Sequence, residues 1–229
     1  MKDVTGLTGA ANLEPTLLQG RRLLNLDTEE EYALYVGCAG GAGTDLSVPL
    51  ETMFGSEGYE SISVRLSGFK GGHSGVDIHL QRGNAIALLA RMLGALLPRF
   101  DFELVRVEGG NMHNAIPREA TAWLRVARSD ESRFRGALEG QLASIAGELI
   151  GIEENLSVEV EPAPAAAEVL AAESARRVLA LLLALPHGVL AMSHDIPGLV
   201  ETSTNLARVR TEAGTLRIHQ STRSAVMSA

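Results

Sequence analysis

The feature that most constrains the fold is an alternation between two hydrophobic periodicities. In residues 60–69 (ESISVRLSGF), Ile62, Val64 and Leu66 fall on one face, and this period of two predicts a strand. Residues 84–97 instead carry apolar side chains at helical spacing and stop at a proline, which predicts a helix. The same periods predict strands over 102–107, 120–127, 156–161, 188–193, 202–210 and 215–222, and helices over 131–150 and 168–185. Helices separated by pairs of strands indicate an α+β fold, with helices packed on one face of a mainly antiparallel sheet.

The N-terminal part of the chain has a different pattern. Residues 22–27 (RLLNLD) form a short apolar run that ends in an acid, and residues 32–38 form a second apolar run, so both are predicted to be strands. The run AGGAG at 39–43 is typical of a flexible breaker. The sequence therefore predicts a domain boundary that separates residues 1–39 from residues 40–229.

Composition excludes several classes of function. Lys and Arg total 20 whereas Asp and Glu total 28, a net charge of −8, which argues against binding to nucleic acid or to an anionic membrane. The single cysteine, Cys38, excludes an internal disulfide framework and a cysteine-based zinc site. No apolar stretch reaches the roughly 20 residues that a membrane span needs. The first residues do not resemble a signal peptide, so we expect a cytoplasmic protein.

Two polar loops at strand ends are candidates for a functional site. The segment FKGGHSG at 69–75 places His73 directly after a strand and among glycines, which allow the backbone to approach a ligand closely. The segment GGNMHNAIP at 109–117 contains Asn114, whose amide both donates and accepts hydrogen bonds. Each segment taken alone also fits an ordinary surface turn, and His79 is expected to be structural.

Two charged side chains complete the candidate set. Arg223 ends the last predicted strand, and a guanidinium is well suited to hold a carboxylate at two points, although a lone arginine at a strand end is usually solvated. Asp27 closes a predicted strand, which is a common way to present a carboxylate to a metal, although an acidic helix start has the same pattern. Oxygen and imidazole ligands would suit zinc, cobalt or manganese.

Taken in order along the chain, these motifs resemble the aminoacyl-histidine dipeptidases (Xaa-His dipeptidase, or peptidase D), a dinuclear-zinc metallopeptidase family. The matching segments are LNLDTEE at 24–30, VGCAGG at 36–41, KGGHSGVDIH at 70–79, NAIPREA at 114–120, VETS at 200–203 with Asn205, and IH at 218–219 followed by RS at 223–224. Several motifs in a consistent order are far more specific than any one of them. The resemblance runs almost to the last residue.

The resemblance implies a role for each candidate residue. Asp27 matches a metal-ligand aspartate, and His73 matches the histidine of the lid domain that stabilises the oxyanion. Asn114 matches a lid asparagine near the substrate, and Arg223 matches the arginine that holds the terminal carboxylate of the substrate. The resemblance also implies a dipeptide substrate, two zinc ions per complete active site with cobalt or manganese possible, and a homodimer formed through the lid domain.

The sequence departs from this family in its metal ligands. The family's His-x-Asp motif and Glu-Glu pair do not occur upstream of Asp27, and the chain stops before the family's last histidine ligand. One carboxylate cannot hold two zinc ions, because each needs about four ligands. We therefore expect residues 1–39 to be a short remnant of an α/β catalytic domain and residues 40–229 to be the lid and dimerisation domain. We expect this chain alone to be inactive and not to bind zinc stably.

Two other interpretations remain open from the sequence. The chain could be a non-catalytic dimerisation or binding module, which would pair through an exposed sheet edge or helix face. It could also be the lid of a related hydrolase such as an acyl-amino-acid amidase. The stretch GGHSGVDIH at 71–79 favours the dipeptidase over the amidase.

Overall fold

The computed structural model describes residues 12–17, 19–22, 24, 31–35 and 37–228. The chain divides into two units, Met1–Gly37 and Cys38–Ala229, and each is considered by itself. In the first unit, η1 (Pro15–Leu17) is a short 3-10 helix. Among the described residues, no helix has the length and apolar character to cross a membrane.

The two strands predicted in the first unit have different outcomes. Much of the run 22–27 lies outside the described residues, and Asp27 is one of the residues outside them. The strand predicted over 32–38 is wrong for the described part of that run, because Tyr32 has a φ of +64° and Leu34 is 95% exposed. An apolar run forms a strand only where its backbone can exchange hydrogen bonds with a neighbouring strand, and the described residues of this run form no strand.

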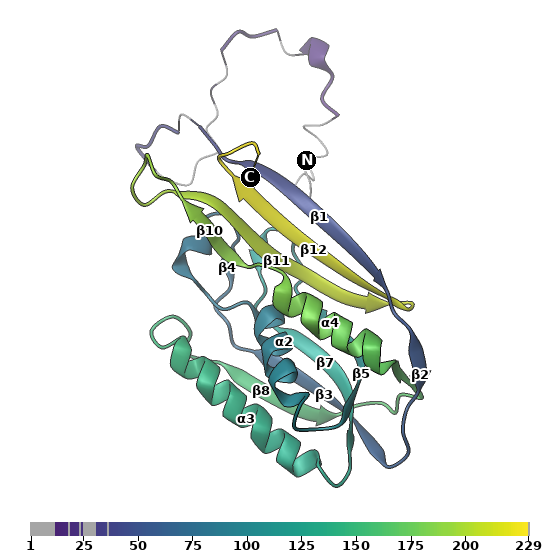
Figure 1. Cartoon of the computed structure of the whole chain (residues 1–229). Helices are drawn as coiled ribbons and strands as arrows, with labels where there is room; N and C mark the ends of the chain where they lie inside the picture. The colour runs from purple at the N-terminus through teal and green to yellow at the C-terminus, as the bar shows by residue number, and fades with distance from the viewer. Residues whose placement is uncertain (1–11, 18, 23, 25–30, 36, 229) are drawn as a thin grey trace. The chain divides into compact units, whose positions relative to one another are not determined.

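The second unit is built on an eight-stranded sheet (Figure 1). Its strands are β1 (Gly40–Pro49), β3 (Tyr59–Ser67), β5 (Phe102–Gly109), β7 (Ala120–Ala127), β8 (Ser157–Pro162), β10 (Gly188–Met192), β11 (Val200–Glu212) and β12 (Thr215–Ser224). Their order is β1-β12-β11-β5-β7-β3-β8, and β10 pairs with the first half of β11. Every pair is antiparallel, as predicted.

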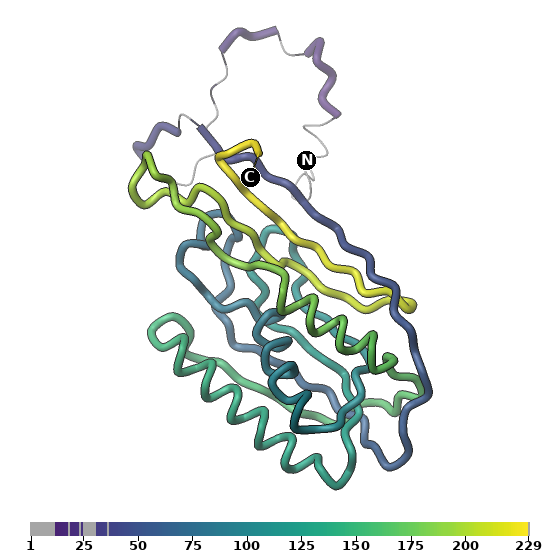
Figure 2. Tube along the Cα trace, viewed as in Figure 1, coloured from purple at the N-terminus to yellow at the C-terminus, as the bar shows by residue number. Residues whose placement is uncertain are grey.

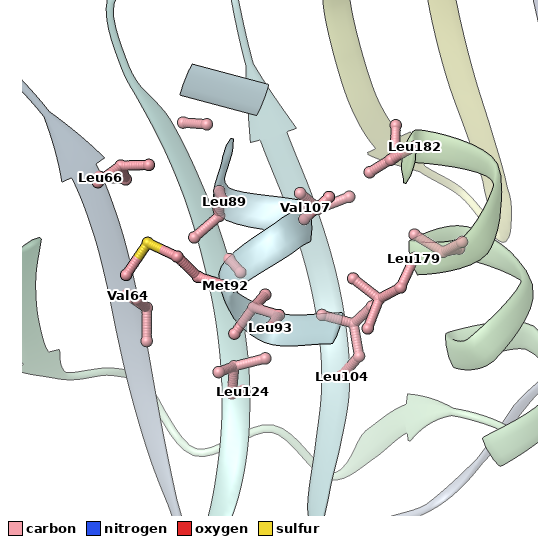
Figure 3. Close-up of a cluster of buried hydrophobic side chains, with 14 of the residues drawn as sticks. Val64, Leu66, Leu89, Met92, Leu93, Leu104, Val107, Leu124, Leu179 and Leu182 are labelled. Carbon is pink, nitrogen blue, oxygen red and sulfur yellow. The ribbon is translucent and has the colours of Figure 1, made fainter. Parts of the chain in front are cut away.

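Helices α2 (Ala85–Leu96), α3 (Glu131–Glu148) and α4 (Ala172–Ala184) lie on one face of this sheet (Figure 1). The alternation of β7 shows why they do, because Ala122, Leu124 and Val126 are fully buried while the residues between them are not. Figure 3 shows how the core is filled: the side chains of α2 lie between those of β3 on one side and those of β5 and α4 on the other. The labelled residues are Leu89, Met92 and Leu93 of α2, Val64 and Leu66 of β3, Leu104 and Val107 of β5, and Leu179 and Leu182 of α4, with Leu124 of β7. The predicted α+β fold is confirmed.

Residues 59–162 contain a βαββαβ unit, whose main elements follow one another as β3-α2-β5-β7-α3-β8. The strands β11, β12 and β1 extend its sheet beyond β5. This junction rests on a short ladder, in which Val209 pairs with Gly109 and Arg210 pairs with Glu108. By contrast, β11 and β12 pair along almost their whole length, and they run side by side in Figure 2.

Two small ladders complete the unit. One joins β2 (Thr52–Phe54) to β9 (Glu168–Leu170), and the other joins β4 (Gly72–His73) to β6 (Ala115–Ile116). The helix predicted from residue 168 therefore begins later, at Ala172, because residues 168–170 pair with β2. The glycine-rich run 39–43 is also not a breaker, because Gly40 begins β1, whose ten residues all pair with β12. In both cases a partner strand overrides the local preference.

Candidate functional site

The imidazole of His73 is held in one tautomer by its own loop. Its Nδ1 accepts hydrogen bonds from the backbone N–H groups of Gly75 (3.2 Å) and Val76 (3.1 Å). A ring nitrogen that accepts hydrogen bonds carries no proton, so the proton of the neutral ring lies on Nε2. Because the side chain is exposed, it offers this Nε2–H group to a ligand.

The turn around His73 is fixed by Asp77 and Arg82. The backbone N–H of His73 donates to Asp77 Oδ2 (2.8 Å), and that of Asp77 donates to the His73 carbonyl (2.9 Å). Arg82 Nη1 donates to the carbonyl of Gly71 (2.5 Å) and lies 3.6 Å from Asp77 Oδ2. A Cβ atom at Gly72 would lie only 2.4 Å from Arg82 Nη1 and 2.5 Å from Asp77 Oδ2, so this position requires glycine.

Asn114 lies beside this turn. The backbone N–H of Ser74 donates to the Asn114 carbonyl (2.8 Å), and His73 is in register with Ala115 in the β4–β6 ladder. Asn205 of β11 is fully buried, and its Nδ2 donates to the Ala115 carbonyl (2.9 Å). The two predicted loops therefore form one ladder, and Asn205 links that ladder to the large sheet.

Arg223 reaches the same turn from β12. A Cβ atom at Gly75 would lie 2.8 Å from Arg223 Nε and 3.0 Å from Arg223 Cζ, so the turn and the guanidinium are in direct contact. Among the described residues, three buried side-chain polar atoms have no hydrogen-bond partner: Ser74 Oγ, Asn205 Oδ1 and Arg223 Nε. Unpaired buried polar groups are costly, and all three belong to residues of this one region. This pattern is typical of a site that binds a polar ligand.

The structure thus brings together three of the four predicted site residues: His73, Asn114 and Arg223. Asp27 lies outside the described residues. Within the described part of the chain, no group of three or more His, Cys, Asp or Glu side chains could hold a metal ion. His79 is exposed on η2 (Ile78–Leu80). The roles of the four candidates remain predictions.

Two further histidines have specific side-chain partners. His219 Nδ1 lies 2.8 Å from Asp45 Oδ1 on the neighbouring strand. His187 lies after α4, and its Nδ1 is 3.2 Å from Nδ2 of Asn84, the N-cap residue of α2. Burial lowers the pKa of His187 to about 4. No local sequence pattern predicts either pairing, because each partner is distant in the chain.

We expect His187 to make the fold less stable in mild acid. Because the folded-state pKa of about 4 lies below the ordinary histidine pKa of 6.5, the unfolded chain binds an additional proton between these values. Stability is therefore fully present above pH 6.5 and falls as the pH decreases, by about 2 kcal/mol at pH 5. Urea unfolding at pH 7.5 and pH 5 measures this loss. The loss should shrink in His187→Gln, which does not titrate, and an unchanged loss would contradict the assignment.

Residues 64–149, within the βαββαβ unit, match the model of a peptidase dimerisation domain (M20_dimer). The chain is 35% identical over 228 residues to a cytosol non-specific dipeptidase of Escherichia coli (strain K12). The aligned region covers 100% of this chain and 47% of that protein. Its fold matches the crystal structure of aminoacylhistidine dipeptidase from Vibrio alginolyticus with a TM-score of 0.87 and 35% identity, over 98% of this chain and 46% of that one.

These matches confirm the resemblance that the motifs indicated. The chain spans about half the length of the relatives that it matches. The relatives are dipeptidases by name, which places the chain among hydrolase homologues. By sequence and by fold, the chain is therefore a homologue of about half of such a dipeptidase, and its residues 64–149 match a peptidase dimerisation domain.

Proposed function

We propose that this chain forms the lid and dimerisation part of a metal-dependent dipeptidase, and that His73, Asn114 and Arg223 are the lid's contribution to the active site. The observation that carries the proposal is the contact between the His73 turn and the Arg223 guanidinium at Gly75. This contact joins an exposed hydrogen-bond donor and a permanent cation in one site. A dipeptide needs both, because it has a carbonyl that becomes an oxyanion and a terminal carboxylate that is always charged.

Each residue has a physical role in the proposed reaction. The Nε2–H of His73 donates to the carbonyl oxygen as negative charge develops on it. The guanidinium of Arg223 binds the free carboxylate of the substrate. Asn114, half-buried beside the turn, offers its amide to the substrate backbone. The buried Arg223 Nε has no hydrogen-bond partner among the described residues, which supports the proposal that a polar ligand binds here.

The proposed complete site uses two zinc ions, with cobalt or manganese as alternatives, and Asp27 is the ligand that this chain would supply. When bound, such metals polarise the carbonyl and activate water. The described residues contain no sufficient ligand set, so they do not fit a metal centre by themselves. The roles proposed for His73, Asn114 and Arg223 do not depend on a metal held by this part of the chain.

We also propose that the protein is a homodimer in the cytoplasm. The match of residues 64–149 to a peptidase dimerisation domain supports the dimer, and the cytosolic name of the Escherichia coli relative supports the compartment. Analytical ultracentrifugation of the chain tests the dimer. A monomer at micromolar concentrations would contradict the proposed dimer. If a complete enzyme that contains this chain is a dimer but has no hydrolytic activity, the result would favour a non-catalytic binding module.

The proposed role of Arg223 is tested in a chimera, in which this chain replaces the matching half of the Vibrio alginolyticus dipeptidase. Arg223→Ala is expected to raise KM for a dipeptide that ends in histidine by about 10–100-fold, since hydrogen bonds to charged groups contribute about 1.5–3 kcal/mol. KM for the C-terminal amide of the same dipeptide should change little, because the amide has no free carboxylate for Arg223 to bind. Arg217→Ala is the matched control, because Arg217 is an exposed arginine on the same strand. An equal increase in KM for the free dipeptide and for its C-terminal amide would exclude the role of Arg223 in binding the carboxylate.

A further inference from the structure

Glu153 is a buried acid that the proposed reaction does not use. It lies in the turn between α3 and β8, and it is 5% exposed. No basic side chain of the described residues forms an ion pair with it; the nearby Lys70 Nζ pairs instead with the exposed Glu154 (3.2 Å). A buried carboxylate is costly unless its oxygens accept hydrogen bonds. The partners of Glu153 therefore show what it stabilises.

Both carboxylate oxygens of Glu153 accept hydrogen bonds from the backbone of a single loop. Oε2 accepts from the N–H of Lys70 (2.8 Å), and Oε1 accepts from the N–H of Gly83 (3.0 Å). Lys70 and Gly83 are the two ends of the segment that carries His73, which we call the 70–83 loop. One carboxylate thus closes this loop at its base, across a large separation in sequence.

The closed base is continuous with the contacts that hold His73. A Cβ atom at Gly83 would lie 2.5 Å from Phe69 Cε1, so the base is packed against the end of the preceding segment. Next to Gly83, Arg82 donates to the Gly71 carbonyl and lies beside Asp77. Asp77 in turn accepts from the backbone N–H of His73. A change in the separation of the loop ends is therefore transmitted to the imidazole through short, direct contacts.

We propose that Glu153 is a positioning residue for His73: by holding the two ends of the 70–83 loop together, it sets the turn in which Nδ1 accepts two N–H groups and Nε2 remains the donor. Glu153 does not touch the substrate and acts only through the loop. The significance of this role for catalysis rests on the proposed function. The role itself is a property of the loop that can be measured without substrate.

The test uses the 229-residue chain and the variant Glu153→Gln. The amide has nearly the shape of the carboxylate, but its NH2 group faces one of the two backbone N–H donors, so one end of the loop is released. We expect the amide hydrogens of Gly75 and Val76 to exchange at least about tenfold faster. The ring 15N shifts of His73 should change from a single tautomer toward a mixture, and the melting temperature should stay close to that of the native chain.

The matched control is Glu154→Gln, which removes the charge of the neighbouring acid that pairs with the side chain of Lys70. It should leave both measurements unchanged. If the amide hydrogens of Gly75 and Val76 exchange in Glu153→Gln at the same rate as in the native chain, the proposal is overturned. Faster exchange of equal size in β11, β12 and α2 would also overturn it, because Glu153 would then serve only global stability. If Glu153→Gln does not fold, Glu153→Asp, which is too short to reach both N–H groups, is judged by the same criteria.

These measurements separate the two proposals. If Glu153→Gln releases the loop but replacement of His73 leaves the activity of the chimera unchanged, the proposed function fails and the positioning role is retained. If His73 matters for turnover and the loop is unaffected in Glu153→Gln, the positioning role fails alone.

Discussion

Replacement of His73 by alanine in the chimera is expected to lower kcat by about 10²–10³-fold, the usual cost of removing one oxyanion donor. The expectation depends on the tautomer, because Gly75 and Val76 donate to Nδ1 and leave the proton on Nε2. KM should change less than kcat, since the bond strengthens as charge develops on the carbonyl oxygen. Steady-state kinetics on a dipeptide that ends in histidine measures both.

His79→Ala is the control for this variant. His79 is an exposed histidine of the same loop, and it has no role in the proposed site. It should leave kcat unchanged. A loss of similar size in both variants would show that the loop, and not the His73 imidazole, is what the reaction needs. An active His73→Ala variant would exclude the oxyanion role directly.

Phe134→Ala is expected to lower the free energy of unfolding by about 3–5 kcal/mol, as is typical of a large aromatic removed from a packed core. Phe134 is fully buried on α3. Its ring lies edge-on to that of Phe100, with centroids 5.4 Å apart, and the centroid of Phe102 is 5.5 Å away. The variant loses both the buried area and these aromatic contacts, and α3 has few other buried anchors, namely Leu138 and Ile145.

Urea unfolding at neutral pH measures this loss. Phe54→Ala is the matched control, because Phe54 is 81% exposed and the same substitution there should change the stability by no more than about 0.5 kcal/mol. A loss below about 1 kcal/mol for Phe134→Ala would contradict the packing of α3 against the sheet.

Strands and helices with a regular pattern could be predicted from the sequence. The alternation in residues 120–127 predicts β7 with its observed bounds, and α2 is predicted to within one residue at each end. The errors occur where a distant partner decides the local structure. β1 begins in a glycine-rich run because β12 is beside it, and residues 168–170 form a strand because β2 is beside them.

The site shows the same division. The glycine-flanked His73 and the Asn114 segment could be found from their local sequence, because tight turns require particular residues at particular positions. That Arg223 contacts the His73 turn could not be found in this way, since the contact depends on how β12 lies against a loop about 150 residues earlier. Asn205, His187 and Glu153 likewise gain their roles from partners that are distant in the chain.

The regularly patterned strands and helices, the glycine-flanked turn of His73, the α+β class and the family that the motifs resemble could be inferred from the sequence alone. All of these depend on periodicity or on residue types within a short window. The three-dimensional structure was needed to show which segments are neighbours, that Arg223 contacts the His73 turn, and which buried acid closes the 70–83 loop. Contacts of this kind arise when segments far apart in the chain bury a common core, and their free energy is not contained in any local stretch of sequence.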